Sequence, residues 1–81
     1  MLVEFYVVNY DIPLRPQARR RAFYRRLHEI LRKHKITSDR STASVWILDR
    51  REVAEEIHNL AASFGVSNLY TAFRTDRASR V

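Results

Sequence analysis

The pattern of hydrophobic and polar positions changes several times along this chain of 81 residues, and each change predicts a new element. Residues 2–10 are almost continuously apolar and rich in β-branched and aromatic side chains, which is typical of a central strand covered on both faces. After Pro13 and Pro16, apolar positions recur at helical spacing up to residue 35. Residues 43–48 and 68–74 return to strand composition and predict two further strands.

A second amphipathic helix is predicted between these two later strands. Asp49 is followed three residues later by Glu52, which is typical of a capping box, so we expect the helix to begin sharply at Asp49. Its apolar face repeats at helical spacing through Val53, Ile57, Leu60, Ala61 and Phe64. Gly65, the only glycine, follows where a left-handed helix cap is expected. The polar residues 38–41 predict a bend that splits residues 36–48 into two short strands.

The order of strand, helix, strand or bent hairpin, helix and strand predicts a ferredoxin-like βαββαβ sandwich. In this α+β fold, two helices cover one face of an antiparallel sheet. We expect a single domain over residues 1–76 and a basic C-terminal tail over residues 77–81. The second sheet face must be wet, covered by a ligand or pressed against another subunit. Because a chain of this size buries only about 60% of its unfolded surface, we favour a sheet-to-sheet homodimer.

Charge and composition narrow the classes of function. Fifteen Lys and Arg against nine Asp and Glu give a net charge of +6, mostly from arginine, whose planar fork suits phosphate. No cysteine is present for disulfides or cysteine-ligated zinc, and one glycine is too few for a glycine-rich phosphate loop. No long apolar run or secretory signal pattern occurs, so we expect a cytoplasmic protein without a membrane span. Histidines fall at spacings that match no usual pair of metal ligands: His28, His34 and His58.

The stretch Tyr10-Asp11-Ile12-Pro13 is the strongest candidate site, because it puts a carboxylate where the first strand ends and the basic helix begins. A carboxylate fixed there could hold a divalent cation, or Asp11 could simply cap or turn the chain into the helix. A helical projection places basic residues in a stripe beside the apolar arc. The candidate nucleic-acid contacts are Arg15, Arg19, Arg20, Arg26 and Lys33.

An RNA-recognition domain shares the same order of elements and stacks bases on aromatic residues of its first and third strands. Four aromatic residues of this chain could stack bases in that way: Phe5, Tyr6, Tyr10 and Trp46. The glycine-containing and basic signature of that domain's third strand is missing, which weighs against it.

Several motifs resemble a known family when they are read in order. Val7-Val8-Asn9-Tyr10-Asp11-Ile12-Pro13, followed by an arginine-rich helix, is similar to the opening of the CRISPR-associated protein 2 family, whose first strand typically ends in Tyr-Asp-Ile or Tyr-Asp-Val. Ser44-Val45-Trp46 stands where that family carries Ser-Val-Phe. Ala72-Phe73-Arg74 resembles the close of the last strand in the related virulence-associated protein D ribonucleases. The resemblance covers residues 1 to about 76.

The resemblance implies a ferredoxin-like homodimer with one of two roles. It would be an endonuclease that cuts RNA or DNA with Mg²⁺ or Mn²⁺ held between two symmetry-related Asp11 carboxylates. Otherwise it would be an adaptor that grips DNA beside a CRISPR integrase during spacer acquisition, a step of antiviral defence. Carried over residue by residue, Asp11 takes the catalytic and metal-ligand role, and Tyr10, Ser44 and Trp46 take supporting positions. The alternative is a non-catalytic nucleic-acid-binding or protein-interaction module that keeps only the fold.

Overall fold

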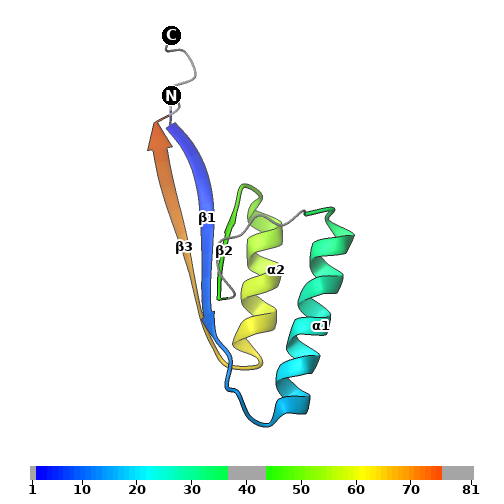
Figure 1. Ribbon diagram of the computed structural model, residues 1–81. Helices are drawn as coiled ribbons and strands as arrows, with labels where there is room; N and C mark the ends of the chain where they lie inside the picture. Colours follow the sequence, from blue (N-terminus) through cyan, green and yellow to red (C-terminus); the bar gives the residue numbers. More distant parts are fainter. Residues whose placement is uncertain (1, 37–43, 76–81) are drawn as a thin grey trace.

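A computed structural model describes residues 2–36 and 44–75 of the chain, and there two helices cover one face of a three-stranded antiparallel sheet (Figure 1). The elements in chain order are β1 (Leu2–Asp11), α1 (Gln17–Lys33), β2 (Val45–Leu48), α2 (Arg51–Ala62) and β3 (Val66–Thr75). The sheet order is β2-β1-β3, so β1 is the central strand, as predicted. This α+β arrangement is compatible with a ferredoxin-like fold. The predicted bend at residues 38–41 and the predicted tail at residues 77–81 lie outside the described residues.

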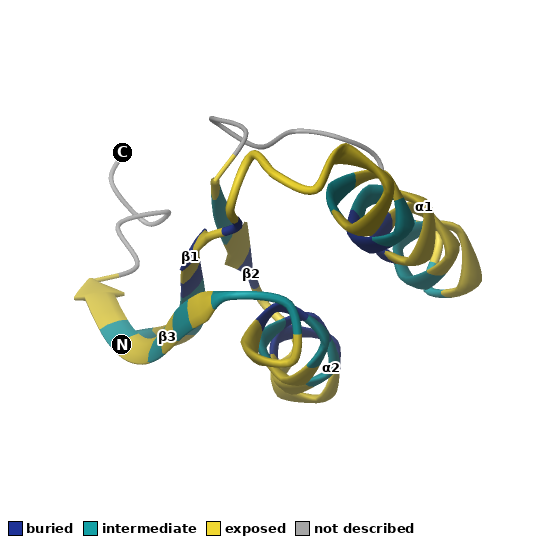
Figure 2. Cartoon of the chain, turned by 90° about the horizontal axis from the view of Figure 1, so that it is seen from below, coloured by how far each residue is buried: buried dark blue, intermediate teal, exposed yellow. Residues whose placement is uncertain are grey.

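The core forms between the sheet and the two helices (Figure 2), because alternate residues of β1 lie on one face of the strand and are buried there. Tyr6, Val8 and Tyr10 are buried there, and the apolar stripes of both helices pack against them. Phe23 of α1 is fully buried and meets Tyr10 edge to face, with the ring centroids 5.1 Å apart. A second edge-to-face contact, at 4.9 Å, joins Phe23 to Tyr24. The predicted apolar faces of both helices are therefore confirmed as the faces that build the core.

Two predicted helix signals are wrong. Helix α2 begins at Arg51 after an extended Arg50, and no side chain caps it, so Asp49 and Glu52 do not form a capping box. Gly65 does not have a positive φ angle. The left-handed residue is Lys35, with φ 58°, which lets the Ile36 N–H donate to the Leu31 carbonyl at 2.8 Å and closes the end of α1.

Position 65 has no room for a side chain, because the turn between α2 and β3 lies against the end of β1. A β-carbon on Gly65 would overlap the carbonyl oxygen of Asp11. It would also come within 3.1 Å of the Ile12 α-carbon and of the Pro13 Cδ atom. Gly65 therefore fixes how closely the α2–β3 turn approaches the segment that carries the candidate carboxylate.

The sheet face away from the helices carries an apolar patch, which we call the open face; its members are Val3, Phe5, Val7, Ile47, Tyr70 and Ala72. The strand register aligns Ile47 and Tyr70 with Val7, one on each side. Ile47 is 56% exposed and Tyr70 is 54% exposed. Among the described residues, both helices lie on the other side of the sheet (Figure 2), so the prediction that β1 is covered on both faces holds for one face only.

Neither of the described helices is long and apolar enough to cross a membrane.

Candidate functional site

Asp11 is the last residue of β1, where the sequence predicted it. It pairs in register with Val66 of β3 and is exposed. Alternation along the strand puts Asp11 on the side of the open face and Tyr10 on the helix side. Helix α1 begins after Pro16 without a side-chain cap, so the alternative in which Asp11 caps this helix is wrong.

The surroundings of Asp11 offer oxygen ligands but only one carboxylate. Asn9 lies two positions earlier on the same side of β1, and Asn68 is its partner in register on β3; both are exposed. Within residues 2–36 and 44–75, no three acidic or histidine side chains come together in a group able to hold a metal ion. A hard divalent cation takes six or more oxygen ligands, so a metal site at Asp11 needs ligands beyond those of one described chain.

The three residues predicted to support the site do come together, but on the opposite side of the sheet. The Tyr10 N–H donates to the Ser44 carbonyl at 3.0 Å, which continues the pairing of β1 with β2. Burial raises the pKa of the Tyr10 phenol, and a hydrogen bond with the Trp46 side chain offsets part of that rise. These three residues thus hold β1 and β2 together on the side of the sheet opposite the Asp11 carboxylate. Any effect they have on Asp11 would pass through the backbone of β1.

The aromatic residues that could have stacked bases are mostly turned away from solvent. Tyr6 and Tyr10 are buried under the helices, and Trp46 packs partly buried against the same core. Only Phe5 of this set lies on the open face, where it is half-buried. Of the four residues nominated for base stacking, Phe5 alone is therefore on the open face, where the exposed Tyr70 of β3 lies on the neighbouring strand.

Three of the predicted basic contacts form what we call the inner stripe: Arg19, Arg26 and Lys33 of α1. The Arg19 guanidinium donates to the Ser63 carbonyl at 2.8 Å and lies over the Phe64 ring, 4.9 Å from its centroid. The Arg26 guanidinium also lies near the Phe64 ring, 5.9 Å from its centroid. Lys33 donates to a carboxylate oxygen of Glu56 at 2.6 Å. All three face α2 and already take part in holding the two helices together.

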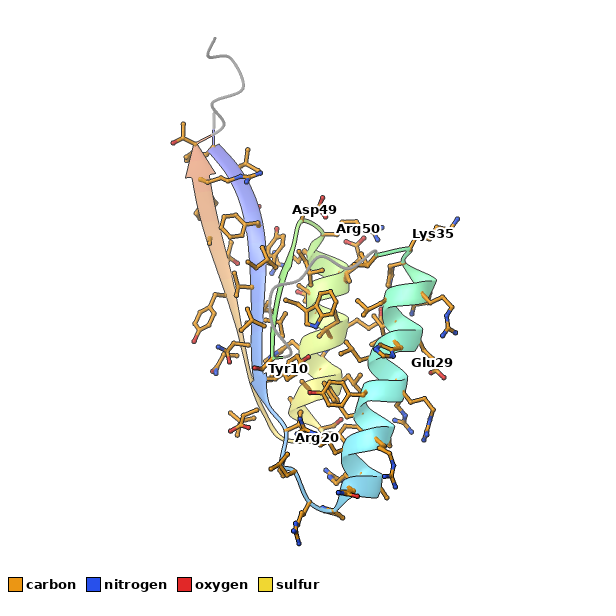
Figure 3. All side chains as sticks on the ribbon, viewed as in Figure 1. Tyr10, Arg20, Glu29, Lys35, Asp49 and Arg50 are labelled. Carbon is orange, nitrogen blue, oxygen red and sulfur yellow. The ribbon has the colours of Figure 1, made fainter. Side chains whose placement is uncertain are left out.

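Two further predicted contacts lie where the chain enters α1. The Arg20 guanidinium donates to the Ile12 carbonyl at 2.7 Å and lies over the Tyr24 ring, so it ties α1 to the end of β1 (Figure 3). Arg15 is exposed in the connecting loop and makes no ion pair or hydrogen bond with the rest of the described chain. Of the predicted set, Arg15 alone is uncommitted within that part of the chain.

A second row of basic side chains, which the sequence reasoning missed, runs along the solvent side of α1. We call it the outer stripe; its members are Arg21, Arg25, His28 and Arg32. They follow one another at spacings of four, three and four residues, which aligns them on one side of a helix. All four are exposed, and none of their side chains forms an ion pair or hydrogen bond with another described residue. The signal was present in the sequence as the positions opposite the apolar arc.

The surplus charge of the molecule is confined to α1. This helix holds seven Lys and Arg and one acid, Glu29, whereas the remainder of the chain holds eight basic and eight acidic residues. The first turn of α1 contains no acid, so the positive end of the helix dipole is not compensated from within the helix. The net charge of +6 therefore belongs to one element on one side of the molecule.

The remaining histidines and Glu56 link elements together. His34 Nε2 lies 2.9 Å from a Glu56 carboxylate oxygen, and His58 Nδ1 lies 2.8 Å from the Ser67 hydroxyl. The hydrogen bond from Lys33 lowers the pKa of Glu56, and the one from His34 lowers it further. At the same end of α1, the Arg50 guanidinium donates to the His34 carbonyl at 2.9 Å. The contacts of Glu56 and Arg50 join the end of α1 to α2 and the residue before it, whereas the His58 contact joins α2 to β3, so both histidines have structural partners.

Comparison of the chain with protein-family models, with curated proteins and with solved structures found no match in any of the three.

Proposed function

We propose that this protein is a nucleic-acid-binding homodimer that resembles the CRISPR-associated protein 2 family and contacts phosphate through α1. The observation that carries the proposal is the confinement of the net charge of +6 to this one helix. A row of unpaired guanidinium groups attracts a polyanion and releases its condensed counterions on contact. Nothing in this contact selects a base sequence, so the binding would depend on the backbone.

The open face supports the dimer. Its centre is apolar, and its strand positions carry one acid, Asp11, and one base, Arg74, at opposite ends. Few charges would therefore have to leave water if two copies brought these faces together. More than half of Tyr70 and of Ile47 is exposed in the single chain, and removal of such apolar surface from water is the usual driving force for an interface of this kind.

The position of Asp11 on this side of the sheet bears on the metal. Two packed sheets lie about 10 Å apart, so two aspartates that point into the gap from opposite sheets can approach each other. This requires the two β1 strands to run in the same direction, because Asp11 lies about 13 Å along the strand from Val7 at 3.3 Å per residue. In that arrangement the shared cation would polarise a phosphate and activate a water for phosphodiester cleavage.

The substitution Asp11→Asn tests the endonuclease role. Mutation of a residue that hydrogen-bonds a metal ligand lowers metal affinity or activity by about 10- to 100-fold. Loss of a ligand itself should therefore slow cleavage of labelled RNA or DNA in Mg²⁺ or Mn²⁺ by about 100-fold or more. Binding should persist, because the outer stripe is unchanged. Addition of a chelator to the unmodified protein should abolish cleavage as well.

Asp49→Asn is the matched control, since it removes the same charge from an exposed residue near the start of α2. It should cleave like the unmodified protein. Equal cleavage by the Asp11→Asn variant would refute the proposed centre. Binding without any cleavage by the unmodified protein would leave the second candidate, a non-catalytic binding module. The absence of a group of three ligating side chains around Asp11 among the described residues favours this candidate.

A pair of substitutions at exposed positions tests the dimer. Ile47→Gln together with Tyr70→Gln removes the apolar centre of the open face without changing the net charge, and both side chains are too exposed to carry much of the core. We expect sedimentation velocity to show a shift from dimer to monomer at micromolar concentration, with the circular dichroism spectrum unchanged. Leu14→Gln, at an exposed loop position off the sheet, should leave the dimer intact. A dimer that survives the double substitution would place the interface elsewhere.

A further inference from the structure

We infer that the outer stripe of α1 receives the phosphate backbone of a nucleic-acid duplex, whereas the inner stripe serves to hold α1 against α2. The inference rests on the proposed nucleic-acid function and assigns that function's contacts to Arg21, Arg25 and Arg32. It replaces most of the residues that the sequence alone nominated.

The availability of the side chains separates the two stripes. Arg19 is held by the Ser63 carbonyl and the Phe64 ring, and Lys33 by Glu56, so a phosphate would have to compete with existing partners. Arg21, Arg25 and Arg32 have no partner among the described residues to give up. From Arg21 to Arg32 the helix rises about 16 Å, which matches several successive phosphates of a duplex that carries one charge per about 1.7 Å of its axis.

The clustering of positive charges on α1 lowers the stability of the helix, which indicates that these charges serve a function. Arg21 and Arg25 lie four residues apart, and like charges at this spacing destabilise a helix by about 0.2–0.5 kcal/mol. The first turn also holds Arg19 and Arg20 beside the positive end of the helix dipole, where an acid would be favourable. An acid at the exposed position 21 would remove the repulsion with Arg25 without disturbing the core. A polyanion that docks along the stripe would relieve the repulsion.

Two hollows beside α1 in the described part of the chain differ in charge, because one is purely basic and the other is balanced. A hollow of about 430 Å³ at the start of the helix is lined by three arginines and no acid: its residues are Leu14, Arg15, Gln17, Arg20 and Arg21. A second hollow, of about 390 Å³, lies between the helices, and there two bases, Arg26 and Lys33, are matched by two acids, Glu29 and Glu56. Carboxylates would repel a phosphate there. The outer stripe therefore leads into the basic hollow, and the inner stripe borders the one that contains acids.

The surroundings of the stripe favour a duplex. Proteins that hold single strands combine basic grooves with exposed aromatic side chains on which bases stack. On α1, Phe23 is buried and Tyr24 lies under Arg20, so no exposed aromatic accompanies the stripe. An anionic membrane is a weaker fit, because an interfacial helix buries its apolar face in the lipid and that face of α1 is packed against the core.

The test compares two triple variants that each remove three positive charges from the net of +6. The outer variant carries Arg21→Gln, Arg25→Gln and Arg32→Gln; the inner variant carries Arg19→Gln, Arg26→Gln and Lys33→Gln. Fluorescence anisotropy with a labelled DNA duplex, repeated over a range of salt concentrations, gives the affinity and its log–log salt slope. Each lost phosphate contact flattens the slope by about 0.9 for a duplex.

The outer variant should bind on the order of 100-fold more weakly at about 0.1 M salt, with a slope flatter by about 2–3. The inner variant should keep a slope within about 1 of the unmodified protein while melting at a lower temperature. If it melts below the assay temperature, the adjacent single variants Arg25→Gln and Arg26→Gln give the same comparison, because Arg26 contacts only the Phe64 ring. Thermal melts of every variant check that each is folded when it is assayed.

Equal losses of affinity and slope in both variants would overturn the inference, since net charge alone would then explain the binding. Tighter binding of a single strand of equal length, or of vesicles containing anionic lipid, would overturn the assignment of a duplex. If the unmodified protein does not bind any of these probes at low salt, the proposed function itself fails. These results are distinguishable because only the last is a failure of the unmodified protein to bind any probe.

Discussion

Replacement of Phe23 by alanine is expected to lower the free energy of unfolding by about 3–5 kcal/mol, which is a large part of the stability of a small domain. Phe23 is fully buried and lies edge to face with both Tyr10 and Tyr24. It also contacts Phe64, at 5.8 Å between centroids, so one ring joins α1 to β1 and to the end of α2. Its removal would leave a cavity that these rigid rings cannot fill.

Urea denaturation followed by circular dichroism measures this effect. The more conservative change Phe23→Leu keeps most of the apolar volume and should cost markedly less, while Arg25→Ala, at an exposed position of the same helix, should change stability by at most about 0.5 kcal/mol. Phe23 is buried and holds the basic helix against the sheet. Its replacement should therefore weaken nucleic-acid binding only under conditions in which the variant unfolds. A cost below about 1 kcal/mol for Phe23→Ala would contradict the packing described.

The substitution Gly65→Ala is expected to cost about 1–3 kcal/mol, although alanine reduces the entropy of the unfolded chain. Its β-carbon would overlap the Asp11 carbonyl oxygen and crowd Ile12 and Pro13. Three of the crowded groups belong to the main chain or to a ring, so none can rotate away. The α2–β3 turn or the end of β1 must therefore move.

Thermal unfolding gives the readout, because each kcal/mol shifts the midpoint of a domain this small by about 4–8 °C. Ala62→Ser, at an exposed position three residues earlier, is the control and should shift the midpoint little. If the protein also has nuclease activity, Gly65→Ala should reduce it at temperatures where the fold persists, since Asp11 would be displaced. An unchanged midpoint would mean that the turn does not lie against β1.

Secondary structure could be predicted largely from the sequence because each element carries a strong periodic pattern. The β-branched and aromatic run at residues 2–10 became β1, and the helical spacing of Phe23 and Leu27 placed the core face of α1. The signals at helix ends were less reliable, because they depend on one or two residues. Asp49 stands two residues before α2 and cannot cap it, and Lys35 adopts the left-handed conformation that was expected of Gly65.

The roles of the arginines could not be predicted from the sequence. A helical projection separates the apolar arc from the basic positions, but it does not say where a second helix will pack. Arg19 and Arg26 lie beside the apolar arc, and this put them against Phe64 once α2 was in place. In the same way, the end position of Asp11 and its separation from Tyr10 followed from the strand pattern, whereas the place of Trp46 on the same side as Tyr10 followed only from the register of β1 with β2.

The confinement of the surplus charge to α1 gives a single chain an asymmetric charge distribution, positive on one side of the sheet and nearly neutral on the other. The field of an approaching polyanion would turn such a molecule before the two touch, which shortens the rotational search and speeds association at low salt. Two chains joined back to back through their neutral sides would cancel this dipole and carry a positive pole at each end. Such an assembly could tether two separate polyanions at once.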